Sequence, residues 1–313
     1  AVQKTFSLSD LIDVAGAQAD MRRNVIRMAY AGSFDEDPLR IIRALSMSAL
    51  FGFAIEKKTA QTMIKKRALL GAVSYERIRD ELFKIFSSSR SYQYVKGLDD
   101  AGILSVILPE LNCMRKVAQG PYHHLDVWKH SLESLKQFDL LCARFKKDAQ
   151  MAAYLEQSIG GERSRRSLIA LAMILHDIGK PGTKRRRDGK TVFRGHERLG
   201  RDMAREIARK LKLSNDETHA LCGMVFWHLR PGYLGDFKKV TPRAAFRYFR
   251  DTAEEAASTL VLSLADQRAT RGPLTTEASR LQHERICSGL IKEFFRRKNA
   301  VELPRLLNGD EVM

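Results

Sequence analysis

A histidine and an aspartate stand side by side at the end of an almost wholly apolar run, in ALAMILHDIGKPG (residues 170–182). Burying a carboxylate costs free energy unless it is paired or coordinated. His176 and Asp177 therefore either form a capping aspartate beside a hydrogen-bonded core histidine, or they carry out chemistry. Two other residues have a related setting. His130 lies on an apolar helical pattern in DVWKHSLESL, and Asp266 ends a second apolar run in TLVLSLADQ.

If these four residues converge, they form a mixed nitrogen and oxygen ligand set with room for water. Such a set suits Mn, Fe, Co, Ni or Mg rather than a closed structural zinc site. A divalent ion held there would lower the pKa of bound water and polarise a phosphoryl oxygen. His196, at the start of one expected helix, and His228, at the end of another, are further candidates.

Four consecutive cations, Lys184, Arg185, Arg186 and Arg187, follow shortly after the His-Asp pair. The whole chain has 54 Lys and Arg against 37 Asp and Glu, a net charge of +17. This excess favours a polyanionic partner. The run could contact a phosphate backbone through salt-dependent, sequence-independent interactions. A solvated hairpin tip is the simpler interpretation of the run, and it stays open.

A second group of side chains suited to ligand recognition lies in FDEDPLRIIRAL, residues 34–45. Asp37 is expected to cap a helix whose first residue is Pro38. Arg40 then shares a helical face with Asp37, and Arg43 continues the row. An acid and an arginine presented together can read the donor-acceptor edge that cytosine and adenine share. The residues alone also allow a capping Asp37 with an ordinary ion pair to Arg40.

Helices must position both groups. Gly and Pro are sparse, and apolar residues recur at three- and four-residue spacing, as in Ile41, Leu45 and Ala49. Asp188-Gly189, between residues of strand character, predicts a small hairpin. The periodicity breaks near residues 112–122, where a boundary is expected. The fold class is therefore predicted to be all-α, in two modules, with at most one small β-hairpin.

The sequence offers no sign of a membrane or secretory segment. No run approaches the roughly 20 apolar residues that cross a bilayer, and the first residues do not resemble a signal peptide. The four cysteines lack metal-binding spacing. We therefore expect a reduced, cytoplasmic protein with no membrane partner.

The order His130, His176-Asp177 and Asp266 resembles that of the HD superfamily of metal-dependent phosphohydrolases. The resemblance implies that these four residues bind a metal, and that Lys180 of HDIGK is a catalytic lysine on the phosphate side. For His196 and His228 it implies a second metal or a contact with phosphate. An HD fold with a vestigial metal site is the alternative.

The segments FDEDPLRIIRAL, FGFAIEKKT and SYERIRDELFKIF resemble the neck of bacterial class II tRNA nucleotidyltransferases, the CCA-adding enzymes, and of poly(A) polymerases. The resemblance implies that Asp37, Arg40 and Arg43 form a protein template for an incoming CTP or ATP. It also implies that residues 76–82 brace this template helix. Residues 11–21 resemble the linker before the neck. An HD domain follows the neck in many of these bacterial enzymes.

Four segments are expected from these resemblances: a linker remnant of a nucleotidyltransferase head at 1–30, a nucleotide-selecting and RNA-binding neck and body at 31–112, an HD-type domain at 113–300, and a tail at 301–313. The Gly-Gly-x-Val-Arg-Asp loop and the Asp-x-Asp pair of such a head are not found before residue 10. The carboxylates that hold Mg²⁺ during nucleotidyl transfer are therefore expected on a head domain missing from this chain.

The sequence thus predicts the C-terminal portion of an enzyme that adds nucleotides to the 3′ end of tRNA or another RNA, with an HD domain that acts as a metal-dependent phosphohydrolase. Two alternatives stay open. One is a free-standing HD phosphohydrolase that acts on nucleotides or 2′,3′-cyclic phosphates. The other is an RNA-binding module without either activity. The residues do not separate CCA addition, A-only addition and poly(A) synthesis.

Overall fold

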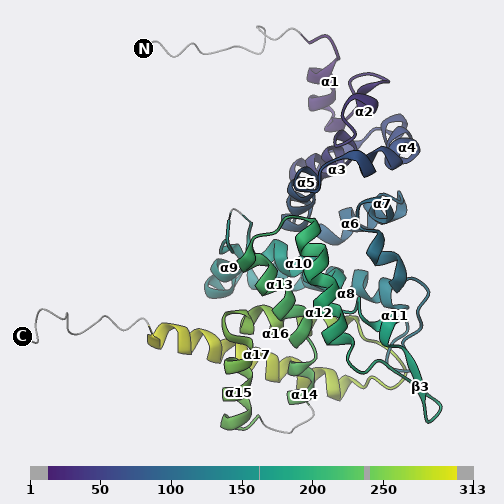
Figure 1. The fold of residues 1–313 in the computed structure, drawn as a ribbon. Coiled ribbons are helices and arrows are strands. Elements are labelled where there is room, and N and C mark those ends of the chain that lie inside the picture. Colours follow the sequence, from purple (N-terminus) through teal and green to yellow (C-terminus); the bar gives the residue numbers. More distant parts are fainter. Residues whose placement is uncertain (1–12, 162, 236–239, 302–313) are drawn as a thin grey trace, which may run out of the picture.

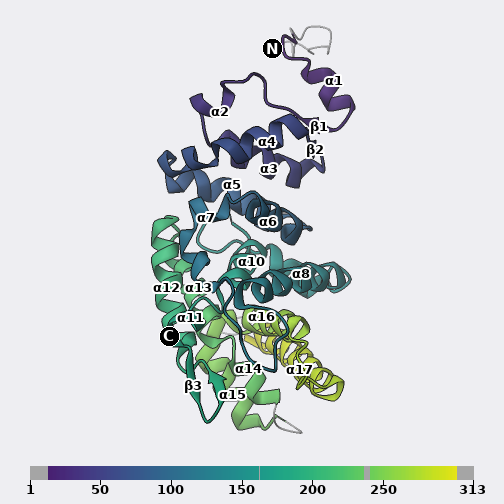
Figure 2. The same ribbon diagram turned by 90° about the vertical axis from the view of Figure 1, so that its right-hand side faces the viewer.

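The computed structural model describes residues 13–161, 163–235 and 240–301. The first residues of the expected linker and nearly all of the expected tail lie outside these ranges. The described helices stack along one long axis, with the N-terminal helices at one end and the C-terminal helices at the other (Figure 1, Figure 2). Among the described residues, no helix has both the length and the apolar character that crossing a bilayer requires.

The N-terminal end of the molecule consists of short helices and one pair of two-residue strands. The elements are α1 (Ala17–Arg22), β1 (Val25–Ile26), α2 (Ser33–Glu36), α3 (Arg40–Phe51), β2 (Ala54–Ile55), α4 (Lys57–Lys66), α5 (Tyr75–Ser87), α6 (Ser91–Asp100) and α7 (Leu104–Ile107). Strands β1 and β2 pair in parallel. The sequence did not predict this pair, because two residues are too short for a strand pattern to emerge.

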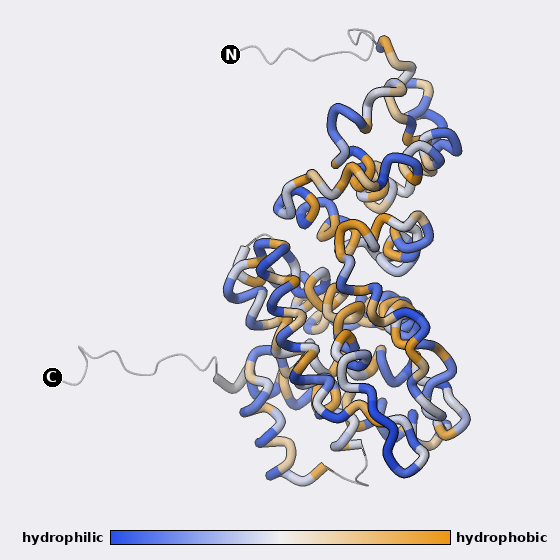
Figure 3. Tube along the Cα trace, turned by 45° about the vertical axis from the view of Figure 1, so that its right-hand side comes forward, coloured by the Kyte–Doolittle hydropathy of each residue, from blue (hydrophilic) through white to orange (hydrophobic). Residues whose placement is uncertain are grey.

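The larger C-terminal part surrounds one fully buried helix. Its elements are α8 (Val127–Phe145), α9 (Ala149–Glu156), α10 (Arg165–Leu175), α11 (Lys180–Thr183), β3 (Arg185–Arg187), β4 (Lys190–Val192), α12 (His196–Lys210), α13 (Asn215–Trp227), α14 (Arg230–Gly235), α15 (Pro242–Thr252), α16 (Ala256–Ala269) and α17 (Glu277–Val301). Every residue of α10 is buried, because α5, α8, α13 and α16 pack around it. The apolar stretches concentrate where helices meet (Figure 3).

The two predicted modules share a continuous core. Helix α5 packs against α10, and α6 packs against α8. A buried polar contact joins them, because Asp139 of α8 accepts hydrogen bonds from Ser91 Oγ and from the backbone N–H of Tyr92, both at 2.9 Å. Arg166 also donates to Asp139, at 3.2 Å. The all-α prediction is confirmed, and the neck packs directly on the helical body that follows it.

The predicted hairpin is confirmed at residues 185–192. Strands β3 and β4 are antiparallel, and both residues of the connecting loop have positive φ, 50° at Asp188 and 74° at Gly189. A two-residue loop with two positive φ values is a type I′ turn, which Asp-Gly favours. The hairpin projects from the end of the molecule opposite α1 (Figure 2).

Asp37 caps the start of a helical segment, as predicted. It follows the last residue of α2 in an extended conformation, with φ −140° and ψ 94°, because a proline disfavours the helical conformation of the residue before it. Its carbonyl accepts from the N–H of Arg40 at 3.1 Å, and its carboxylate accepts from the N–H of Leu39 at 3.3 Å. The regular part of α3 begins at Arg40, two residues later than the predicted Pro38.

Candidate functional site

Six buried or half-buried side chains converge beyond the C-terminal end of α10. His176 and Asp177 follow α10 directly, His196 is the first residue of α12, and His228 follows the last residue of α13. His130 comes from α8 and Asp266 from α16. Five helices thus place polar groups in one region of the core, and each predicted histidine and aspartate is there.

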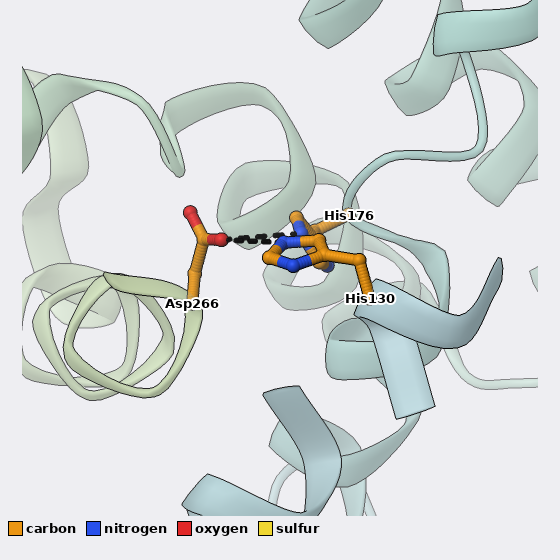
Figure 4. A group of neighbouring side chains, drawn as sticks. All are labelled: His130, His176 and Asp266. Carbon is orange, nitrogen blue, oxygen red and sulfur yellow. Dashed lines mark hydrogen bonds and ion pairs between the residues drawn. The ribbon is translucent and has the colours of Figure 1, made fainter. Parts of the chain in front are cut away.

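The first group of three contains His130, His176 and Asp266 (Figure 4). Nε2 of His130 lies 2.8 Å from Oδ1 of Asp266, and Nε2 of His176 lies 3.8 Å from the same oxygen. Both histidine side chains are almost completely buried, whereas 22% of the Asp266 side chain is exposed. Asp266 is therefore the member of this group that solvent can reach.

The second group of three contains Asp177, His196 and His228. Oδ1 of Asp177 lies 3.4 Å from Nε2 of His196 and 3.7 Å from Nε2 of His228. The sequence assigned Asp177 to the first group, and its other oxygen does face that group, since Oδ2 lies 3.2 Å from Nε2 of His176. Asp177 therefore lies between the two groups, with one oxygen toward each.

Backbone carbonyls orient three of the histidines in the same way. Nδ1 of His176, His196 and His228 lies 2.7 to 2.8 Å from the carbonyl oxygen three residues earlier in the chain. A neutral imidazole that donates from Nδ1 presents an unprotonated Nε2, the form that binds a metal. The local turn before each histidine therefore sets which nitrogen faces the centre.

The buried atoms at the centre fit a divalent ion. Nε2 of His176 and Oδ1 of Asp177 are buried and have no hydrogen-bond partner among the described residues. In each group, one ligand atom per residue can be chosen so that all three lie within 4.8 Å of one another. Imidazole nitrogens and carboxylate oxygens suit Mn, Fe, Co, Ni or Mg. Coordination would also compensate the cost of leaving these polar atoms unsatisfied.

The electrostatics at the centre keep Asp177 charged. Burial by itself would raise the pKa of Asp177, but His176 and Lys180 outweigh it and hold that pKa well below its usual value. Burial by itself would lower the pKa of His176, but the carboxylates of Asp177 and Asp266 outweigh it and raise that pKa. Burial and the neighbouring histidines His176 and His196 lower the pKa of His228 to about 3.

Lys180 does not face solvent. Its ammonium is buried, and it donates to Oδ2 of Asp177 and to Oε1 of Gln119, each at 2.6 Å. Gln119 was missed in the sequence, because it lies in the irregular segment between the helices and belongs to no pattern.

His123, from the same segment, packs its ring edge-on against His130 with the ring centres 4.6 Å apart. Nothing local to His123 indicates this contact.

A glycine fixes the approach of the loop after Asp177 to α12. A Cβ on Gly179 would overlap the carbonyl oxygen of His196 and lie 2.6 Å from the N–H of Gly200. The backbone of residue 179 can therefore come this close to α12 only without a side chain. This contact holds His196 against the loop that carries Asp177.

In the neck, side chains of helix α5 form ion pairs with two of the three residues that were predicted to bind nucleotide. Asp37 accepts two hydrogen bonds from Nη2 of Arg77, at 2.9 and 3.1 Å. Nε of Arg43 donates at 3.2 Å to the buried carboxylate of Glu81. Both partners belong to the 76–82 segment, so this segment contacts the predicted template through ion pairs.

The third residue, Arg40, points elsewhere. Its guanidinium donates to the carbonyl and the hydroxyl of Ser33, at 3.2 and 3.1 Å. Arg40 and Arg43 both line a cavity of about 370 Å³, together with Tyr30 and Met47. Asp37 is not among the residues that line it. The structure therefore brings the two arginines together and leaves the aspartate beside Arg77.

Basic side chains gather in two places in the body. Lys184, Arg185, Arg186 and Arg187 are exposed at and before strand β3. A second set lines an open groove of about 690 Å³ between α8, the end of α16 and the start of α17. The cations of this groove are Arg144, Lys147, Arg268, Arg271 and Arg280. Its carboxylates are Glu277 and Glu284, so the groove, which the sequence did not single out, carries a net positive charge.

Two protein families match the chain. Residues 52–114 match the probable RNA and SrmB-binding site of polymerase A, and residues 127–271 match the HD domain. These two matches cover most of the helices described above.

Curated relatives extend this similarity along the chain. The chain is 32% identical to an A-adding tRNA nucleotidyltransferase of Deinococcus radiodurans, over 97% of this chain and 65% of that protein. It is 26% identical to a CC-adding tRNA nucleotidyltransferase of Thermus thermophilus, over 95% of this chain and 62% of that protein. The chain thus spans less than two thirds of the length of either relative.

Solved structures share the fold. One is a tRNA nucleotidyltransferase complexed with a primer tRNA and an incoming ATP analogue, with a TM-score of 0.55 and 16% identity over 94% of this chain and 67% of that chain. Another is a CCA-adding enzyme with ATP, with a TM-score of 0.53 and 16% identity over 95% of this chain and 56% of that chain. The likeness covers both the neck and the helical body.

Proposed function

Because the chain belongs to the class II CCA-adding enzyme and poly(A) polymerase family, and spans its RNA-binding neck and body together with its HD domain, we propose that it serves nucleotide addition to RNA 3′ ends. In this proposal the neck (31–112) selects CTP or ATP and the basic helices hold tRNA or another RNA. The similarity to the A-adding enzyme over 97% of the chain carries the proposal. Mg²⁺ for the transfer step would be held by carboxylates of a head domain that these residues do not provide.

The template role rests on how the neck presents its polar groups. Arg40 and Arg43 line the cavity of about 370 Å³, where they can donate to ring nitrogens or carbonyl oxygens of a base. Asp37 is paired with Nη2 of Arg77, yet a carboxylate has about four acceptor positions. It can therefore still accept from the exocyclic amino group of cytosine or adenine.

RNA contact is proposed for both basic sets. The groove cations Arg144 and Arg271 come from separate parts of the chain and could follow a phosphate backbone along α8. The exposed run Lys184–Arg187 could add contacts at the hairpin. Phosphate contacts of this kind supply affinity but little sequence preference.

A chain joined to a nucleotidyltransferase head tests the template. The assay measures incorporation of labelled CTP or ATP into tRNA. Asp37→Ala and Arg40→Ala should abolish the preference for CTP and ATP over UTP and GTP, while tRNA binding persists. Lys96→Ala, on an exposed part of α6 where Lys96 pairs with Asp100, is the matched control. Unchanged base preference in both variants would exclude the template role.

A second function is favoured by the two groups of side chains that share Asp177. We infer that they form a metal-dependent phosphohydrolase site with His130, His176, Asp177 and Asp266 as principal ligands. His196 and His228 would hold a second ion or contact phosphate. A bound divalent ion supplies an activated water and polarises a phosphoryl oxygen.

The protein side chains prepare this chemistry. The backbone carbonyls hold the histidines with Nε2 inward. Lys180 balances the charge of Asp177 and is the proposed phosphate-side lysine. Asp266, the exposed ligand, marks where a phosphate ester would enter.

Two assays with added Mn²⁺, Ni²⁺, Co²⁺, Fe²⁺ or Mg²⁺ test this function. One measures release of phosphate from nucleotides, and the other measures opening of 2′,3′-cyclic phosphates to monophosphates. Asp177→Asn should abolish both reactions. Cyclic-phosphate hydrolysis without nucleotide addition by the head-joined protein would favour the free-standing phosphohydrolase. Salt-sensitive RNA binding with neither activity would favour a binding module.

A further inference from the structure

A cavity of about 470 Å³ opens onto the two groups of histidines and aspartates. Its wall includes Asp266 from the first group and His228 from the second. The remaining wall comes from Leu229, α14, α16 and the start of α17, with one residue, Tyr122, from the segment before α8. A cavity that reaches both groups from outside is the route by which a substrate would approach them.

Two exposed aromatic side chains stand on this wall. Tyr122 and Tyr233 are each 58% exposed, and they come from parts of the chain 111 residues apart. Exposed aromatic rings forgo the free energy that removal of apolar surface from water would supply. Their presence on one cavity calls for a ligand with a flat apolar face.

The backbone of Tyr122 is held firmly even though its ring is exposed. The N–H of Gly272 donates to the carbonyl of Tyr122 at 2.8 Å. A Cβ on Gly272 would overlap the backbone of Pro121 and Tyr122, so the two segments are in close contact. The ring therefore projects from a fixed position, which lowers the entropy cost of binding a ligand.

The described part of the wall offers hydrogen-bonding groups, from Ser263, Gln267, Ser279 and His283. Phosphate charge can be balanced at the histidine and aspartate end, where a metal ion would lie.

We propose that Tyr122 and Tyr233 form a nucleobase-binding site at the mouth of the phosphohydrolase centre, for a nucleotide substrate. The base stacks on the tyrosine rings, and the phosphate points toward Asp266 and His228. A nucleoside monophosphate, or the last nucleotide of an RNA, has this form. The inference rests on the proposed phosphohydrolase and names its substrate class.

Equilibrium dialysis with adenosine 5′-monophosphate and with ribose 5-phosphate separates the base from the rest of the ligand. The full chain carries Arg40→Ala throughout, so that nucleotide bound at the neck does not contribute. Tyr122→Ala and Tyr233→Ala should each weaken adenosine monophosphate binding by roughly tenfold, as expected for removal of one base-stacking ring. Binding of ribose 5-phosphate should not change. Tyr122→Phe and Tyr233→Phe keep the ring and should retain affinity.

Phe246 provides the matched control, since it is also 58% exposed and does not line the cavity. Phe246→Ala should leave both affinities unchanged. Unaltered adenosine monophosphate binding in both Tyr→Ala variants would overturn the proposal. An equal decrease in affinity for both ligands would also overturn it, because the tyrosines would then act through the structure.

This experiment also separates the two proposals. Binding does not require turnover, so tyrosine-dependent binding without any metal-dependent phosphate release would support the base site and exclude the phosphohydrolase. Metal-dependent release with an unchanged KM in both Tyr→Ala variants would exclude the base site alone. If both the phosphohydrolase and the nucleobase-binding site exist, the Tyr→Ala variants should have a raised KM for adenosine monophosphate and a nearly unchanged kcat.

Discussion

Nζ of Lys180 lies 2.6 Å from Oδ2 of Asp177, with both side chains almost completely buried. Removing one partner of a buried ion pair leaves the other charge uncompensated. Lys180→Met should therefore lower the free energy of unfolding, by about 3 kcal/mol. Added Mn²⁺ should restore part of this stability, because an ion at the centre would compensate Asp177. Denaturant unfolding with and without Mn²⁺ measures both effects.

Lys184→Met is the control for this change, because Lys184 is exposed and its replacement should alter stability by less than about 0.5 kcal/mol. If Lys180→Met were as stable as Lys184→Met, the ion pair would contribute nothing to the fold.

Asp177 faces both groups of three, and this position predicts how metal content responds to substitution. His130→Ala should weaken binding at the first group, and His228→Ala at the second. Asp177→Asn should weaken both, because each of its oxygens faces a different group. Metal analysis of the purified variants after incubation with Mn²⁺ measures this. Equal metal content in the wild type and Asp177→Asn would contradict the assignment.

The close approach of Gly179 to the backbone of His196 predicts that a side chain at residue 179 would destabilise the protein. Gly179→Ala should destabilise the protein by about 2 kcal/mol or more, since its Cβ would overlap backbone atoms that cannot rotate away. Gly223→Ala, within α13, is the matched control, because a Cβ there meets nothing within 4 Å. Alanine in a helix interior is favoured over glycine by roughly 1 kcal/mol, so this variant should be slightly more stable. Thermal unfolding compares the two, and equal midpoints would show that the contact is not tight.

The raised pKa of Asp139 predicts that the stability of the protein depends on pH. Burial raises its pKa to about 6, although Tyr92, Ser91 and Arg166 donate to it. The unfolded pKa is about 3.9, so between these values the folded state binds more protons than the unfolded state. The contribution of Asp139 therefore favours folding most below about pH 4 and diminishes as the pH rises through 6.

The difference in unfolding free energy between the wild type and Asp139→Asn isolates this contribution, because other carboxylates titrate in both proteins. The wild type should lose stability relative to Asp139→Asn between about pH 4 and 6, by at most about 1.4 kcal/mol per pH unit. A difference that stays constant over this range would show that Asp139 keeps an ordinary pKa.

The groove between α8 and α17 predicts the salt dependence of RNA binding. Arg144→Ala and Arg271→Ala should weaken tRNA binding and reduce the slope of log affinity against log salt by roughly 0.7 to 0.9 for each phosphate that is no longer neutralised. Arg209→Ala, an exposed change on α12 where Arg209 pairs with Glu206, serves as the control. Filter binding at several salt concentrations measures the slope. Identical slopes in all three variants would place the RNA elsewhere.

The sequence alone predicted the helices and the hairpin, because both depend on local patterns. The apolar run before His176 is buried as a helix, and Asp188-Gly189 adopts the two positive φ values of its turn. The order of His130, His176-Asp177 and Asp266 also led to the prediction that these side chains meet, and the distances between them confirm that they do. A spacing of three or four residues, or a two-residue loop, constrains the backbone wherever the segment lies in the fold.

Only the tertiary structure decided how these segments face one another. The pairing of Asp37 with Arg77, the bonding of Gln119 to Lys180 and the position of Tyr122 on the cavity join residues at least 40 positions apart. Irregular segments such as 115–126 carry no periodic signal, so neither Gln119 nor His123 could be placed from the sequence. The two directions of the Asp177 carboxylate follow from the packing of five helices around it. No local pattern encodes that packing, because it results from the burial of apolar faces along the whole chain.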